Sequence, residues 1–201
     1  MLKARDFRQQ AWKKLSGNWA VAVIAVLLLG LIVGALSFTW VGPFIISGPL
    51  TLGVAIIVLK IVRGEKPEIT NLFDGFSDFV RSLILYIINT IFVALWSLLF
   101  VIPGIIKHYS YSMSFYILKD NPELTANEAR IKSMEMMNGN KWRLFCLDFS
   151  FIGWILLSML TFGILMFWVS PYMEVAHAEF YQSLLPAPAE APEQLPAPDA
   201  E

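Results

Sequence analysis

The feature that most constrains this chain is the absence of any charged residue from Leu15 to Leu59. Two further uncharged tracts run from Ser82 to Ile106 and from Phe149 to Met173. A helix needs about 20 apolar residues to cross the hydrocarbon of a bilayer, so the first tract has room for two crossings. The apolar region of a cleavable signal peptide has only about 7–15 residues, which argues against that interpretation.

Each uncharged tract is interrupted by Pro or Gly, at Gly42-Pro43, Pro103-Gly104 and Gly163, where the chain can turn back. We therefore predict an all-α fold: a polytopic membrane helix bundle built as three hairpins, with cytoplasmic amphipathic helices. The bundle has about six transmembrane helices, which we place at residues 18–39, 42–62, 80–101, 104–118, 142–160 and 163–181.

The composition agrees with a membrane protein. The chain of 201 residues is 57% hydrophobic and 15% charged, whereas a soluble domain has about 45–50% apolar and about 25% charged residues. The net charge of −1 gives no electrostatic reason to expect nucleic acid as a partner. A single cysteine, Cys146, cannot form an internal disulfide, and we interpret it as a small buried apolar side chain.

The basic residues predict the orientation. Of the 15 Lys and Arg residues, all except Lys107 precede the first predicted crossing, lie between the second and third, or lie between the fourth and fifth. Because loops rich in Lys and Arg stay in the cytoplasm, these segments and both termini are predicted to be cytoplasmic.

Short matches indicate internal repetition. Ser16-Gly17-Asn18-Trp19 resembles the segment from Asn138 to Trp142, and Pro67–Thr70 resembles Pro122–Thr125. We predict one membrane domain over residues 1–185, made of pseudo-repeats at about 1–64, 65–120 and 121–185, with chance similarity as the alternative. The amphipathic helices either lie on lipid or pack on the bundle. The acidic, Pro- and Ala-rich tail at 186–201 is predicted to be disordered in the cytoplasm.

Two polar stripes fall within the predicted crossings. Their helical spacing keeps the polar side chains on one face, and exposing that face to lipid would leave them unsatisfied. We therefore expect them to face the bundle interior as a ligand-binding or structural polar cluster. Its residues are Lys107, Ser110, Tyr111, Ser114, Asp148, Glu174, His177 and Tyr181.

Within this cluster the sharpest prediction is an ion pair between Lys107 and Glu174. Asp148 would then have Arg143 or Tyr181 as its polar partner. Two alternatives remain: Lys107 can extend to the outer surface, and polar stripes can act only as packing contacts between helices. Gly30 and Gly34 form a small-residue face that packs within the chain or mediates self-association.

No enzymatic motif is present. The sequence lacks H-E-x-x-H, G-x-S-x-G, a P-loop and any Cys/His cluster with metal-ligand spacing. We predict no enzymatic activity, no cofactor and no metal. The expected partners are membrane lipids, with other membrane proteins or self-association as further candidates.

Six segments carry a resemblance to a known family: Ile102–Lys107, Tyr109–Met113, Lys119–Leu124, Asn138–Phe145, Phe151–Trp154 and Pro171–Met173. They resemble the bacterial membrane protein family called domain of unknown function 975. The resemblance covers most of the chain and implies a bacterial plasma-membrane protein of several spans, without any activity or catalytic residue.

Two functional hypotheses follow. The first is a scaffold or accessory subunit of a membrane complex, motivated by the amphipathic helices, the tail and the lack of catalytic motifs. The second is a small transporter, channel or lipid-handling protein that uses the polar cluster around Lys107 and Glu174.

Overall fold

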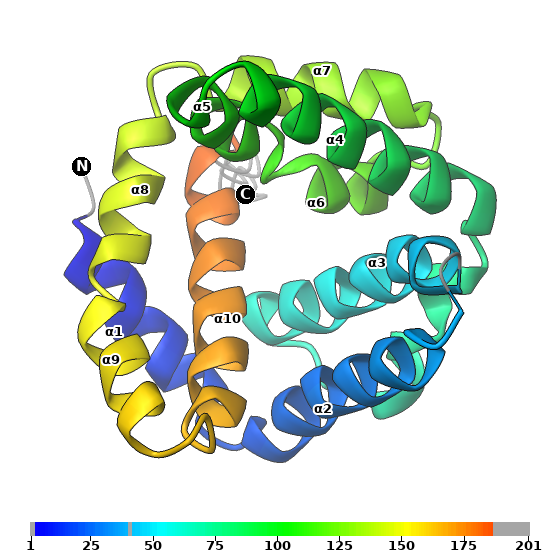
Figure 1. Cartoon of the computed structure of the whole chain (residues 1–201). Helices are drawn as coiled ribbons and strands as arrows, with labels where there is room; N and C mark the ends of the chain where they lie inside the picture. Colours follow the sequence, from blue (N-terminus) through cyan, green and yellow to red (C-terminus); the bar gives the residue numbers. More distant parts are fainter. Residues whose placement is uncertain (1–2, 40–41, 187–201) are drawn as a thin grey trace, which may run out of the picture.

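The computed structural model describes residues 3–39 and 42–186 (Figure 1). In these residues every regular element is a helix and no strand forms, which confirms the predicted all-α class. The elements are α1 (Ala4–Leu15), α2 (Trp19–Leu36), α3 (Gly42–Arg63), the short 3-10 helices η1 (Ile69–Leu72) and η2 (Asp74–Phe76), α4 (Phe79–Leu99), α5 (Val101–Tyr111), α6 (Ser114–Asp120), α7 (Ala126–Met136), α8 (Lys141–Phe149), α9 (Ile152–Leu160) and α10 (Met166–Leu184).

Four helices in the described ranges are long and apolar enough to cross a membrane: α2, α3, α4 and the pair α8–α9. The residues of the fourth predicted crossing do not form one continuous helix, because a turn at Ser112 and Met113 divides them between α5 and α6. With 11 residues, α5 is about 16 Å long, roughly half the thickness of the hydrocarbon. The sixth predicted crossing corresponds to α10, which carries Glu174, His177 and Glu179.

Helix α3 forms the centre of the molecule. It packs against α2, α4, α6, α10, η1 and η2, and it lies beside α10 in the middle of the bundle (Figure 1). In its most apolar stretch 78% of the residues are buried, compared with 11% in α2 and in α4. The apolar residues of α2 and α4 therefore point mostly outward, as they do in helices that face lipid.

The small-residue face of α2 is part of this outward surface. Gly30 and Gly34 are exposed, and a Cβ added at either one would meet no described atom within 4 Å. The predicted packing of this face within the chain is therefore wrong, because α2 turns Ala22 and Ala25 toward the bundle instead.

Two glycines allow the segment between α3 and α4 to lie directly on α3. A Cβ at Gly53 of α3 would clash with the backbone carbonyl oxygen of Leu72. A Cβ at Gly75 of η2 would clash with the backbone carbonyl oxygen of Pro49. Only residues without a side chain permit both approaches, so η1 and η2 are fixed against the middle of α3.

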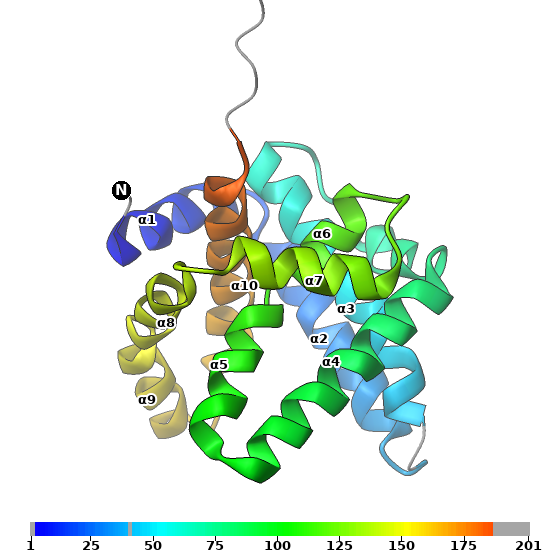
Figure 2. The same cartoon turned by 90° about the horizontal axis from the view of Figure 1, so that it is seen from above.

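Helices α4 and α5 form a V (Figure 2). The chain reverses at Phe100, whose backbone is extended, and Gly104 packs so closely on Ser97 that a Cβ would overlap its side chain. The closed end of the V lies on the side of the molecule opposite α1, α6 and α7 (Figure 2).

The two Gly-Asn breaks adopt the same local geometry. Gly17 and Gly139 have φ of +96° and +78°, in the left-handed region that favours glycine. In each break the following Asn, Asn18 or Asn140, directs its side-chain amide to the carbonyl four residues earlier. The similarity of the segments α1–α2 and α7–α8 is thus local, and the division into three pseudo-repeats stays a prediction.

The amphipathic helices pack on the bundle. In α1 the apolar residues Phe7, Ala11 and Leu15 are buried, and the Phe7 ring lies 5.3 Å from that of Phe180 in α10. The corresponding residues of the second segment, Ala129 and Ser133 of α7 and Met137 at its C-cap, are buried as well. The predicted disordered tail, residues 186–201, lies outside the described residues except for Pro186.

Candidate functional site

The polar stripe of α5 and α6 faces α7. Ser110 and Ser114 are fully buried, and each hydroxyl donates to a backbone carbonyl within its own segment. Ser133 of α7 bridges the two short helices, since its hydroxyl donates to the carbonyl of Ser110 and accepts from the backbone N–H of Met113. These hydroxyls therefore join α5, α6 and α7 in the way that polar groups commonly join packed helices.

Tyr111 extends the same seam. Its hydroxyl accepts a hydrogen bond of 3.4 Å from the guanidinium of Arg130 in α7. The guanidinium also lies over two rings, 4.5 Å from the centroid of Phe92 and 5.4 Å from that of Tyr111. This arrangement lets an arginine of α7 approach the apolar surface of α4, because the ring faces attract the cation.

Lys107 lies apart from the other predicted residues. Its Nζ is 5.2 Å from the centroid of the Trp96 ring in α4, and within the described residues it forms no ion pair with Glu174. The predicted Lys107–Glu174 pair is therefore wrong. The reason is the reversal at Phe100, which folds α5 back on α4 and brings the lysine side chain over an α4 tryptophan.

Asp148 has two partners that the sequence did not indicate. Its Oδ1 lies 2.5 Å from His177 Nε2, and its Oδ2 accepts a hydrogen bond of 2.9 Å from the hydroxyl of Tyr109. The three side chains come from α8, α10 and α5, so the contacts join three helices. The expected partners point elsewhere, because Arg143 donates to Asn140 and Tyr181 donates to Asp120.

Glu174 lies one turn before His177 on α10. It is half-buried, and as the residue three positions before His177 its side chain lies on the same face of the helix. We call Tyr109, Asp148, Glu174 and His177 the carboxylate–histidine cluster. It combines two carboxyl groups with one imidazole, so it brings together groups that accept and donate protons.

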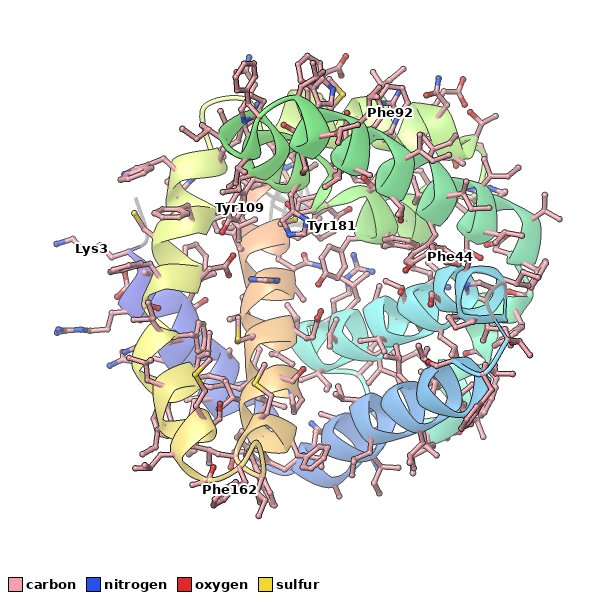
Figure 3. The ribbon with its side chains drawn as sticks, in the orientation of Figure 1. Lys3, Phe44, Phe92, Tyr109, Phe162 and Tyr181 are labelled. Carbon is pink, nitrogen blue, oxygen red and sulfur yellow. The ribbon has the colours of Figure 1, made fainter. Side chains whose placement is uncertain are left out.

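Tyr181 belongs to a second cluster, which we call the Asp120 clamp. Asp120 at the end of α6 accepts a hydrogen bond of 2.9 Å from the Tyr181 hydroxyl. It also forms an ion pair of 2.6 Å with Arg63 at the end of α3. The ring of Tyr181 stacks on Tyr116 at 5.3 Å. Tyr109 and Tyr181 lie near the same end of α10 (Figure 3).

Further polar contacts attach the short helices to the bundle. Lys14 of α1 lies 2.7 Å from Glu179 of α10 and donates to the carbonyl of Val62 in α3. Arg81 of α4 donates to the carbonyls of Asn121 and Leu124, between α6 and α7. Each of these bases thus binds an acceptor on a different segment of the chain.

Glu128 of α7 is a charged group whose pKa is displaced by its local contacts. Its carboxylate accepts hydrogen bonds of 2.7 Å from the backbone N–H and from the hydroxyl of Thr125, and these bonds lower its pKa. Thr125 in turn accepts from the backbone N–H of Glu128, so the two residues form a capping box at the start of α7.

No group of three or more His, Cys, Asp or Glu side chains in the described ranges could hold a metal ion.

The sequence identified Asp148, Glu174, His177 and Tyr181 as interior polar residues but missed Tyr109, Asp120 and Arg63. Tyr109 lies off the periodic polar stripe of its helix, and Arg63 and Asp120 lie at helix ends, where a charge is ordinary. No pattern in a single sequence would have singled them out.

Comparison with known proteins gives one match. The model of a family described as "Protein of unknown function (DUF975)" matches residues 1–107 and 98–187. No curated protein and no solved structure matches the chain.

Proposed function

Since the chain belongs to DUF975, a family of proteins of unknown function, we propose that it is a non-enzymatic integral membrane protein that serves as a scaffold or accessory subunit of a membrane complex. The observation that carries this proposal is the attachment of its short polar helices to the apolar ones. Charged side chains hold α1, α6 and α7 through the Asp120 clamp, the Lys14–Glu179 pair and the contacts of Arg81.

These contacts favour a rigid surface. The carboxylate of Glu179 is only 5% exposed and that of Asp120 only 19%, so each ion pair is shielded from water on at least one side and is less screened than a surface pair. A group of helices held in this way forms a pre-shaped face, and binding to it costs a partner little ordering entropy. We call α1, α6 and α7 the helical platform.

The orientation of the platform is part of the proposal. The chain crosses the plasma membrane of a bacterium six times, as three hairpins, with α1, α7 and both termini in the cytoplasm and α6 at the cytoplasmic end of the fourth crossing. In this arrangement α5 and α6 together make the fourth crossing and α10 makes the sixth. The closed end of the α4–α5 V then lies on the outer side.

Cysteine labelling tests the orientation. In a Cys146→Ser background, a cysteine in place of the exposed Ser77 should react with a membrane-impermeant maleimide only after the cells are opened. A cysteine in place of Phe162, which is 98% exposed in the α9–α10 turn (Figure 3), should react in intact cells. The reverse pattern would refute the orientation.

Site-specific photo-crosslinking tests the scaffold role. A photoreactive amino acid at the exposed Glu135 of α7 should give a discrete crosslinked protein in native membranes, and one at Phe162 should not. The Arg63→Met variant, which breaks the Asp120 clamp, should reduce the crosslink from Glu135. If Glu135 and Phe162 crosslink the same proteins, or none, the scaffold proposal fails.

A second candidate function rests on the carboxylate–histidine cluster. A carboxyl group in contact with an imidazole and a tyrosine hydroxyl, with a second carboxyl group one helical turn away, is typical of proton pathways in membrane proteins. If the chain conducts or couples protons, Asp148→Asn should abolish the proton flux of reconstituted vesicles. Lys107→Met, which changes a charge outside the cluster, should leave that flux unchanged. Vesicles without any flux above that of empty liposomes would exclude this candidate.

A further inference from the structure

An aromatic cavity lies where α1, α2, α9 and α10 meet. It has a volume of about 360 Å³ and is lined mainly by Trp12, Trp19, Trp154, Trp168 and Tyr172. Four of the seven tryptophans of the chain thus surround one space. The carboxylate–histidine cluster and the Asp120 clamp contribute none of the lining residues, so neither proposed function uses this cavity.

The aromatic wall is built into the fold. The Trp12 ring lies 5.2 Å from that of Trp19 and 5.6 Å from that of Tyr172, in both cases edge to face. The hydroxyl of Tyr172 donates to the backbone carbonyl of Arg8, which binds α10 to α1. Such edge-to-face contacts fix the rings relative to one another, so the cavity is present before any ligand binds.

The chemistry of the lining selects a hydrocarbon ligand. Its surface is almost entirely apolar, and its volume falls within the range of cavities that hold small molecules. Trp12, Trp154 and Trp168 remain 53%, 42% and 49% exposed. Rings that are left so accessible present a large apolar area for an acyl chain to cover.

Helix α1 supplies a charged region beside the cavity. Arg5 and Arg8 precede Trp12 by seven and four residues, so the three side chains share one face of the helix. Arg5 lies about 10 Å along the helix axis from Trp12. Arg5 is exposed, and within the described residues it forms no ion pair. A ligand with an anionic group next to a hydrocarbon chain would contact the charged region of α1 and the apolar cavity at the same time.

We propose that this cavity binds an acyl chain of an anionic phospholipid, whose phosphate lies against Arg5, since Arg8 already donates to the carbonyl of Ser150 and lies over the Phe151 ring. The inference requires only that the chain resides in a membrane, and it is independent of the scaffold role and of the orientation proposed above. Aromatic cages also bind choline, through the attraction between a cation and ring faces. Here the arginines repel a second cation, so the anionic lipid is favoured over a choline lipid.

Native mass spectrometry of the full chain in detergent tests the proposal. Phosphatidylglycerol and phosphatidylcholine with the same acyl chains would be added in turn, and the bound fraction of each would be measured. We expect about fivefold tighter binding of phosphatidylglycerol, since each base near an anionic headgroup contributes about that factor. Equal binding of the two lipids, or tighter binding of phosphatidylcholine, would overturn the proposal.

Matched variants test the headgroup contact and the acyl-chain cavity separately. Arg5→Gln should reduce the preference for phosphatidylglycerol at least about twofold, whereas Lys132→Gln, at an exposed base of α7, should not. Trp154→Ala should weaken the binding of both lipids. Trp142→Ala removes a more exposed tryptophan, 71% exposed and outside the cavity, and should have no effect.

A variant with a bulkier lining residue keeps the test decisive if Trp154→Ala unfolds. Leu165→Trp narrows the cavity without removing an aromatic ring, and it should also weaken the binding of both lipids. If a folded Leu165→Trp variant or a folded Trp154→Ala variant binds lipid as the unmodified chain does, the acyl chain lies elsewhere and the cavity assignment is wrong.

Discussion

At the scale of single residues, the glycines of α3 determine how the chain packs. A Cβ at Gly53 would lie 1.9 Å from the carbonyl oxygen of Leu72, a backbone atom that cannot rotate away. A Cβ at Gly30 would meet no described atom within 4 Å. The two positions share a residue type and a helical setting but differ in their surroundings, so they form a natural comparison.

Gly53→Ala should lower the free energy of unfolding by at least about 2 kcal/mol, because η1 must move away from α3 to make room. Gly30→Ala should leave stability unchanged or raise it by up to about 1 kcal/mol, because alanine favours the helix. Unfolding of both purified variants in the same detergent provides the measurement. Equal stability of the two would show that the close approach to Leu72 is absent in solution.

The polar residues illustrate what a single sequence can predict. Periodicity correctly placed Ser110, Tyr111 and Ser114 on a buried face, because unsatisfied hydroxyls are costly in any apolar environment. It could not identify their partner helix, since partners depend on the direction in which α5 leaves Phe100. The same missing information led to the incorrect pair of Lys107 with Glu174.

At the scale of elements, helix starts were better predicted than helix lengths. The Gly-Asn breaks and the capping box of α7 depend on residues that are neighbours in sequence, so their geometry is encoded locally. The division of residues 104–118 into α5 and α6 has no such signal. It depends on the packing of α6 against α3 and α7, which is a tertiary effect.

The capping box makes the start of α7 sensitive to pH. The hydrogen bonds from Thr125 lower the pKa of Glu128 below its ordinary value of 4.5. Since the folded pKa is the lower one, the stabilisation is fully present above pH 4.5 and is lost as the pH falls through the folded pKa. The first turn of α7 should therefore open in acid.

Hydrogen exchange can detect this opening. The amides of the first turn of α7 should lose protection below the folded pKa of Glu128 in the unmodified chain. In Glu128→Gln the side chain can still accept from Thr125 but does not titrate, so any fall in protection below pH 4.5 should be smaller. Identical pH profiles for the two chains would rule out Glu128 as the titrating group.

At the scale of the whole molecule, the Asp120 clamp connects the end of α3 to α6 and α10. The side chains of Arg63 and Asp120 are 35% and 19% exposed, so the pair is only partly shielded. Removing one partner leaves the other charge without its counter-ion in a partly dry position. Removing both avoids that cost, so the two changes should not be additive.

Arg63→Met and Asp120→Asn should each lower the free energy of unfolding by about 1–2 kcal/mol, a range between those of surface pairs and fully buried pairs. The double variant should lose less than the sum of the two, because neither charge is left alone. Asp78→Asn, which breaks the local ion pair with Arg81, serves as the control and should change stability by less than about 0.5 kcal/mol. Additive losses from Arg63→Met and Asp120→Asn would mean that the two residues act separately and that their ion pair does not stabilise the fold.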